Sequence, residues 1–274
     1  MDYEFAPLSI GETCFQYLKE GTGNPIVFVH GFSSPMCIWD RNFYFLNEHG
    51  FSVLRYDLYG RGRSGKPRVG YTLELFVTQL KELLDYLNIR GEVSLAGLSM
   101  GCSICASFTI NFPERVKDLI LIAPAGLGEK SFTMKLITLP IIGTFLYELV
   151  GKKMLVKGVL DTIGDDPEGR KYILREYEFQ IADPMYRYAL ISTLKYGPLY
   201  GLDWLYRRLG LLENKRGALI WGTSDNVVHF SLHKEILNLV PWLSFFPIEG
   251  GTHVVNFQKS EIVNRVLLNS LQVK

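Results

Sequence analysis

The chain has 274 residues, 47% of them hydrophobic and 21% charged, with a formal net charge of +1. This is the composition of an ordinary globular protein with a sizeable core, and the length fits a single α/β domain. The near-zero charge leaves no electrostatic footprint for nucleic acid or for an anionic membrane. We therefore expect a protein that acts on small molecules, and we predict no metal site.

The four cysteines and the apolar segments show nothing that requires an oxidising compartment or a membrane. Cys102 and Cys105 form a CxxC pair inside a predicted helix, so we interpret them as small core residues. The N-terminus lacks the basic start and apolar run of a signal peptide. The most apolar stretch, residues 136–150, is short for a bilayer crossing and is interrupted by proline, glycine and glutamate. We expect a cytoplasmic protein without stable membrane insertion.

Along residues 1–126, short apolar runs rich in β-branched residues alternate with amphipathic stretches. This alternation is typical of βαβ units around a parallel sheet. Residues 9–20 predict a hairpin that turns at Gly11-Glu12. Further strands are predicted over 26–29, 52–56, 92–96 and 116–122, and helices over 39–48, 73–87 and 100–111. The last helix ends at Phe112-Pro113, because a proline disfavours the helical conformation of the residue that precedes it.

The alternation stops after Gly126 and resumes near residue 218. The intervening segment reads as several helices, strongly apolar over 135–150 and rich in tyrosine, without a clear central strand. Strands over 218–221 and 243–248 and helices over 230–239 and 259–271 complete the chain. We predict one α/β core formed by residues 1–126 and 214–274, interrupted by a helical insertion at residues 127–213.

A candidate nucleophile stands between a strand and a helix, in the segment Gly97-Leu-Ser-Met-Gly101. A serine hydroxyl is a weak nucleophile and must be held clear of the backbone, close to a base. A tight strand-to-helix turn provides this, and glycines on either side let strand and helix approach without Cβ clashes. A bare GxSxG pattern is more often an ordinary turn. Its position directly after a predicted buried strand favours Ser99 as the nucleophile.

A second loop, His30-Gly-Phe-Ser-Ser34, follows the predicted strand 26–29 and is the candidate oxyanion loop. We predict that the backbone N–H groups of Phe32 and Met100 form the oxyanion hole. His30 is interpreted as a structural histidine at the base of this loop. The residues that we expect to contact the substrate are Gly31, Ser33, Leu98 and Trp39.

The acid and the base are expected late in the chain, after the last two strands. Asp225 follows the strand 218–221, and His253 is the only histidine of the final segment. His229 and His233 compete by residue type but fall in or at the start of the intervening helix. Asp203 competes for the acid but lies within the insertion. The predicted catalytic residues are therefore Ser99, Asp225 and His253.

Together these motifs resemble the α/β-hydrolase superfamily, and they span nearly the whole chain outside the insertion. The sequence is most similar to serine esterases and acylglycerol lipases with a helical cap, and to carbon–carbon bond hydrolases of ring-cleavage pathways. The resemblance implies a mostly parallel sheet of about eight strands flanked by helices. It also implies that the segment Asp57–Ser64 is a structural turn. Two departures weaken the subfamily assignment: Asn226-Val-Val228 lacks the usual proline, and Val254–Gln258 lacks the usual acid-proline pair.

The resemblance further implies a two-step acyl transfer without a cofactor. Ser99 attacks a carbonyl, His253 takes its proton, and Asp225 orients the imidazole. We call the turn Gly97–Gly101 the elbow. A serine rather than an aspartate at its centre argues against haloalkane dehalogenases and epoxide hydrolases. A medium-chain ester or a monoacylglycerol is the first choice of substrate, which predicts a carboxylesterase or lipase. A carbon–carbon hydrolase of a ring-cleavage diketone and a slow hydrolase that serves as a ligand receptor remain alternatives, and a homodimer stays open.

Overall fold

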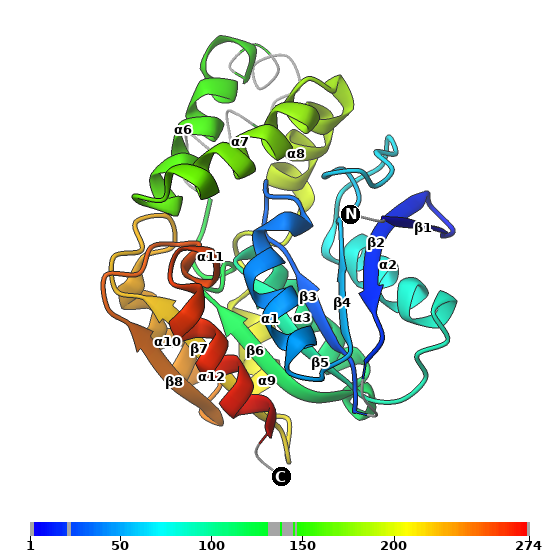
Figure 1. The fold of residues 1–274 in the computed structure, drawn as a ribbon, viewed down its shortest axis with the longest axis vertical. Helices are drawn as coiled ribbons and strands as arrows, with labels where there is room; N and C mark the ends of the chain where they lie inside the picture. Colours follow the sequence, from blue (N-terminus) through cyan, green and yellow to red (C-terminus); the bar gives the residue numbers. More distant parts are fainter. Residues whose placement is uncertain (1–2, 21–22, 131–137, 139–144, 146, 273–274) are drawn as a thin grey trace.

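The computed structural model describes residues 3–20, 23–130, 138, 145 and 147–272, and its centre is a twisted sheet (Figure 1). Eight strands follow the order β1-β2-β4-β3-β5-β6-β7-β8. Neighbours from β4 through β8 run parallel, whereas β2 is antiparallel to both β1 and β4. The strands are β1 (Glu4–Pro7), β2 (Glu12–Leu18), β3 (Ile26–Val29), β4 (Val53–Tyr56), β5 (Val93–Leu98), β6 (Val116–Ile122), β7 (Arg216–Gly222) and β8 (Leu243–Ile248). The predicted mostly parallel sheet of about eight strands is confirmed.

Helices cover both faces of the sheet. The helix α1 (Asp40–Glu48) packs against α12 (Ser260–Gln272) on one face. On the other face, α3 (Met100–Asn111) packs against α2 (Leu73–Tyr86) and α9 (Asp203–Gly210) (Figure 1). All four residues of β3 are buried, which explains why its sequence is a continuous apolar run instead of an alternating one. The helices of the core are η1 (Met36–Trp39), α1 (Asp40–Glu48), α2 (Leu73–Tyr86), α3 (Met100–Asn111), η2 (Pro113–Arg115), η4 (Phe230–Leu232), α10 (His233–Leu239), α11 (Val255–Gln258) and α12 (Ser260–Gln272).

Two predicted elements differ from the structure. The N-terminal hairpin joins β1 to β2 through residues 8–11, so its turn comes before Glu12 and its first strand lies upstream of the predicted one. The Leu8 N–H closes this turn on the Gly11 carbonyl at 3.2 Å. A four-residue strand ending in proline carries too weak a propensity to be recognised without its partner. The helix predicted over 230–239 is divided into η4 and α10.

The described part of the insertion is helical, with no strand between β6 and β7 among the residues that the structure describes. It contains η3 (Tyr147–Gly151), α6 (Lys152–Ile163), α7 (Pro167–Ile181), α8 (Pro184–Tyr196) and α9 (Asp203–Gly210). The side chains of Asp166 and Asp183 cap α7 and α8, each followed by a proline at the first helical position. Most of the predicted apolar stretch 135–150 lies outside the described residues. We use the word cap for α6, α7 and α8, which stand together at one end of the sheet (Figure 1).

No described helix combines the length and the apolar character that a bilayer crossing requires.

Candidate active site

Ser99 occupies the sharp turn between β5 and α3, in a backbone conformation that non-glycine residues rarely adopt. Its φ is 54° and its ψ is −117°. Such a conformation costs on the order of 1–3 kcal/mol and persists only where neighbouring contacts enforce it. A Cβ on Gly97 would lie 2.7 Å from the Cys102 nitrogen, and a Cβ on Gly101 would lie 2.2 Å from the Val29 oxygen. The two glycines therefore allow the packing that holds Ser99 in place.

The predicted acid and base are joined by a hydrogen bond in the loops after β7 and β8. The Nδ1 atom of His253 lies 2.9 Å from Oδ2 of Asp225. The other carboxylate oxygen accepts the N–H groups of Val227 and Val228 at 2.9 and 3.0 Å, and Trp221 Nε1 donates to Oδ2 at 3.2 Å. These bonds fix the carboxylate with one oxygen aimed at the imidazole. With Nδ1 as the donor, Nε2 of His253 is left as the basic nitrogen.

A single large cavity brings Ser99 and His253 together. Its volume is about 800 Å³, and both side chains line it. Among the described residues of its wall there is no lysine, arginine, aspartate or glutamate, and most of the wall is apolar. The cap contributes residues that the sequence did not single out: Leu155 and Val159 of α6 and Leu190, Ile191 and Leu194 of α8. Apolar residues at helical spacing signal burial, but they do not reveal whether the buried face meets the core or a ligand.

The loop of residues 30–34, the candidate oxyanion loop, lies directly against the turn that holds Ser99. A Cβ on Gly31 would come 3.3 Å from the Ser99 Cβ and 3.4 Å from the Leu98 carbonyl oxygen. Gly31, Phe32, Ser33 and Leu98 all line the cavity. Met100 is the first residue of α3, so its N–H is one of the free amides at a helix N-terminus. The structure therefore gathers both predicted oxyanion residues around Ser99.

Trp39 is the exception among the predicted substrate contacts. Its side chain is fully buried and packs on Phe28, with ring centroids 4.9 Å apart, so it belongs to the hydrophobic core and is absent from the cavity wall. The short helix η1 directs Ile38 into the cavity and turns the adjacent Trp39 towards the sheet. Closeness to the loop in sequence was therefore not sufficient to predict which side chain lines the cavity.

His30 has the structural role that the sequence predicted. Its Nε2 accepts the Leu58 N–H at 2.8 Å, and its Nδ1 lies 2.9 Å from the Gly31 carbonyl oxygen. Burial of the ring lowers the pKa of His30 to about 3, so this side chain is neutral.

Of the three competing candidates, His229 lines the cavity, whereas Asp203 and His233 do not. Asp203 begins α9 and is absent from the cavity wall. His229 lines the cavity, whereas His233 stacks on Phe245 and bonds to the Phe230 carbonyl. The two histidines are four residues apart, a spacing that occurs in metal sites. Among the described residues, however, no three histidine, cysteine or acidic side chains are grouped to hold a metal ion.

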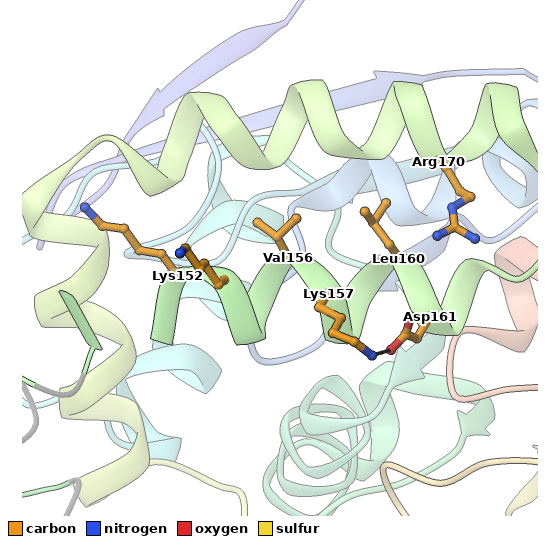
Figure 2. Close-up of a pocket in the computed structure, with 7 residues that line it drawn as sticks. Lys152, Val156, Lys157, Leu160, Asp161 and Arg170 are labelled. Atoms are coloured by element: carbon orange, nitrogen blue, oxygen red, sulfur yellow. Dashed lines mark hydrogen bonds and ion pairs between the residues drawn. The ribbon is translucent and has the colours of Figure 1, made fainter. Parts of the chain in front are cut away.

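A second hollow of about 420 Å³ lies on the other side of α6, against α7 (Figure 2). Its wall includes the apolar side chains of Val156 and Leu160 and the charged side chains of Lys157, Asp161 and Arg170. Lys157 and Asp161 form an ion pair at 2.6 Å. No residue of the predicted triad lies in this hollow. The helix α6 thus separates the cavity lined by Ser99 and His253 from a solvent-facing surface.

The fold and the elbow serine define the class to which this chain belongs, the α/β hydrolases. More specifically, the chain belongs to the family described as serine aminopeptidase, S33, whose model matches residues 23–257. An uncharacterized protein of Mycobacterium tuberculosis is 30% identical over 224 residues, covering 76% of this chain and 63% of that protein. The chain therefore spans less than two thirds of the length of this relative.

Solved structures share the whole fold at low sequence identity. The enol-lactonase from Burkholderia xenovorans has a TM-score of 0.81 and 18% identity, with 98% of this chain and 100% of that chain covered. A thermophilic esterase from Thermogutta terrifontis has a TM-score of 0.79 and 20% identity, with coverage of 98% and 97%. These similarities establish the fold.

Proposed function

We propose that this protein is a serine hydrolase that cleaves an uncharged, lipophilic carboxylic ester, such as a medium-chain ester or a monoacylglycerol. One observation carries the proposal: Ser99 and an Asp225-bonded His253 open into the same large, mostly apolar cavity. A pocket of this kind buries most of a small ligand and leaves orientation to a few polar groups.

The proposed reaction gives each of these groups a role. His253 Nε2 takes the Ser99 hydroxyl proton while Oγ attacks the ester carbonyl, and Asp225 stabilises the imidazolium that forms. The N–H groups of Phe32 and Met100 stabilise the negative charge on the carbonyl oxygen. His253 then gives its proton to the departing alcohol. Water, activated by the same imidazole, releases the acid from Ser99 and restores the serine hydroxyl.

The absence of charged side chains in the described cavity wall favours an ester over a peptide with a free amino terminus, the substrate of an aminopeptidase. An aminopeptidase must bind a free ammonium group, and burying an unpaired charge is costly. The described wall has no acidic side chain to pair with that group and no basic side chain to pair with an anion. This favours a neutral ester over a free amino terminus, and also over a carboxylate-bearing substrate.

The test is hydrolysis of p-nitrophenyl esters from acetate to palmitate, by the wild type and by Ser99→Ala. We expect turnover that favours medium or long chains and is lost in the variant. An aminoacyl p-nitroanilide is the matched charged substrate, and we expect it to be a poor one. A folded wild type without ester turnover would contradict the proposal and favour the carbon–carbon hydrolase or the receptor. Faster cleavage of the anilide would favour the peptidase.

A further inference from the structure

The oxyanion loop is fixed from two sides by hydrogen bonds to consecutive carbonyls. Arg61 Nε donates to the Phe32 carbonyl at 2.8 Å. The next carbonyl, that of Ser33, accepts two bonds from the cap. Gln180 Nε2 of α7 donates to it at 2.8 Å, and the Tyr186 hydroxyl of α8 donates at 2.9 Å. Both peptide planes after Phe32 are therefore held by side chains that are distant in sequence.

Gln180 connects three parts of the molecule at once. Its side chain is fully buried, and its Oε1 accepts the Gly62 N–H at 2.8 Å while its Nε2 holds the Ser33 carbonyl. Nε2 also lies 3.3 Å from the Tyr186 hydroxyl. A side-chain amide both donates and accepts hydrogen bonds, so Gln180 alone bonds to both of these backbone groups.

Arg61 supports the same loop from the Asp57–Ser64 turn. Its guanidinium is fully buried, and Nη2 donates to Thr193 Oγ1 of α8 at 2.8 Å. The turn that the sequence resemblance treats as purely structural is thus bonded both to the oxyanion loop and to the cap. Burial raises the pKa of the Tyr186 hydroxyl well above its usual value, so this group stays protonated as a donor.

We propose that Gln180 and Tyr186 are positioning residues, through which the cap helices α7 and α8 hold the oxyanion loop in its catalytic conformation. This inference rests on the proposed function, because it assigns the Phe32 N–H to the oxyanion hole. The residue Phe32 lies immediately before the clamped carbonyl, so loss of either donor lets its N–H drift from the developing oxyanion. The α7–α8 part of the cap is accordingly a fixed component of the active site.

The experiment compares Gln180→Met and Tyr186→Phe with Tyr172→Phe as the matched control. Tyr172 also lies on α7 and also donates its hydroxyl to the core, but to Asp40, away from the oxyanion loop. We expect the first two variants to lose about 10- to 100-fold in kcat on the preferred ester, with KM near the wild-type value. Misplaced oxyanion donors weaken transition-state binding more than substrate binding. The control should keep its kcat.

Amide hydrogen exchange over residues 30–36 gives a readout that does not depend on activity. We expect faster exchange in Gln180→Met and Tyr186→Phe than in the wild type, and no change in Tyr172→Phe. Tyr186→Phe removes one oxygen atom, so it keeps the test decisive if Gln180→Met does not fold. Unchanged kcat and exchange in a folded variant would overturn the inference, as would an equal loss of kcat in the control. If the wild type hydrolyses no ester, the proposed function fails, and the exchange rates of the two variants then test by themselves whether Gln180 and Tyr186 hold the loop.

Discussion

At the scale of single residues, the geometry of the elbow depends on its two glycines, Gly97 and Gly101, which have no Cβ atom. Ser99 adopts a positive φ because the strand before it and the helix after it approach more closely than any Cβ would permit. The sequence predicted this from two glycines at fixed spacing. Replacing one of these glycines with alanine therefore tests how tightly the elbow is packed.

Gly101→Ala should destabilise the fold, because its Cβ would lie 2.2 Å from the Val29 carbonyl oxygen, a backbone atom that cannot move aside. We expect a fall of at least about 1–3 kcal/mol in the free energy of unfolding, measured by urea denaturation. Gly158→Ala is the control, since Gly158 is also helical but has no atom within 4 Å of the added Cβ. It should stabilise α6 by about 0.5–1 kcal/mol. Equal effects of the two substitutions would contradict this account.

Because His30 is buried in its neutral form, the free energy of unfolding should decrease in mild acid. Its pKa is about 3 in the folded protein, against an ordinary value of about 6.5 in the unfolded chain. As pH is lowered from about 6.5 towards 3, the unfolded state binds a proton that the folded state excludes. The free energy of unfolding should therefore decrease, by at most about 1.4 kcal/mol per pH unit.

The measurement is urea unfolding of the wild type and of His30→Gln between about pH 4 and 7. The wild type should show the steeper loss of stability. Burial raises the pKa of Asp57, which acts in the opposite direction, but this group is present in both proteins and does not affect the comparison. Parallel pH profiles would show that His30 is not the group responsible.

At the scale of secondary-structure elements, α6 lines the cavity with one set of side chains and the outer hollow with another. Val159 lines the catalytic cavity, whereas Val156, almost one turn earlier, lines the outer hollow (Figure 2). The apolar character of the helix was visible in the sequence, but the division between ligand-facing and outer residues was not.

Val159→Phe should shift the substrate preference towards shorter acyl chains, because the larger ring occupies cavity volume that a long chain would fill. We expect the ratio of kcat/KM for the decanoate ester to that for the butyrate ester to fall by about 10-fold or more, equivalent to about one or two lost methylene contacts. Val156→Phe adds the same ring on the outer side of the same helix. A similar shift in both variants would mean that the effect comes from the helix as a whole and not from the cavity.

The sheet and the order of its flanking helices could be predicted because burial on both faces leaves long apolar runs that are distinct from amphipathic helices. The helix Met100–Asn111 was predicted with its observed bounds, since an elbow and a proline delimit it. The strand Glu4–Pro7 was missed because its stability comes from pairing with β2. The bonds of Gln180 to the oxyanion loop and to the Asp57–Ser64 turn could not be predicted either, because they join residues more than 100 positions apart.

At the scale of the whole molecule, polar contacts tie the cap to the core at several points. Arg41 pairs with Asp166 at the start of α7, and Arg63 pairs with Glu176 in its middle. Together with Gln180, these contacts place residues of one cap helix on three separate core segments. We therefore propose that insertion and core behave as one folding unit.

Urea unfolding followed by far-ultraviolet circular dichroism and by tryptophan fluorescence should give superimposable transitions. The dichroism reports all helices, including those of the cap, whereas none of the four tryptophans lies in α6, α7 or α8. Trp39 and Trp221 are buried in the core, Trp242 packs against it, and Trp204 is half-exposed on α9. Coincident transitions are the signature of a single cooperative unit. An earlier transition seen by dichroism alone would show that the cap unfolds independently, contrary to this proposal.

The proposed function depends above all on Ser99 being a nucleophile that His253 activates. The most direct test is reaction with an alkyl fluorophosphonate, followed by mass spectrometry of the intact protein and of its peptides. We predict one adduct per chain, on the peptide that contains Ser99, formed by the wild type, absent in Ser99→Ala and strongly slowed in His253→Ala. A folded wild type that stays unmodified, or an adduct that survives Ser99→Ala, would contradict the account.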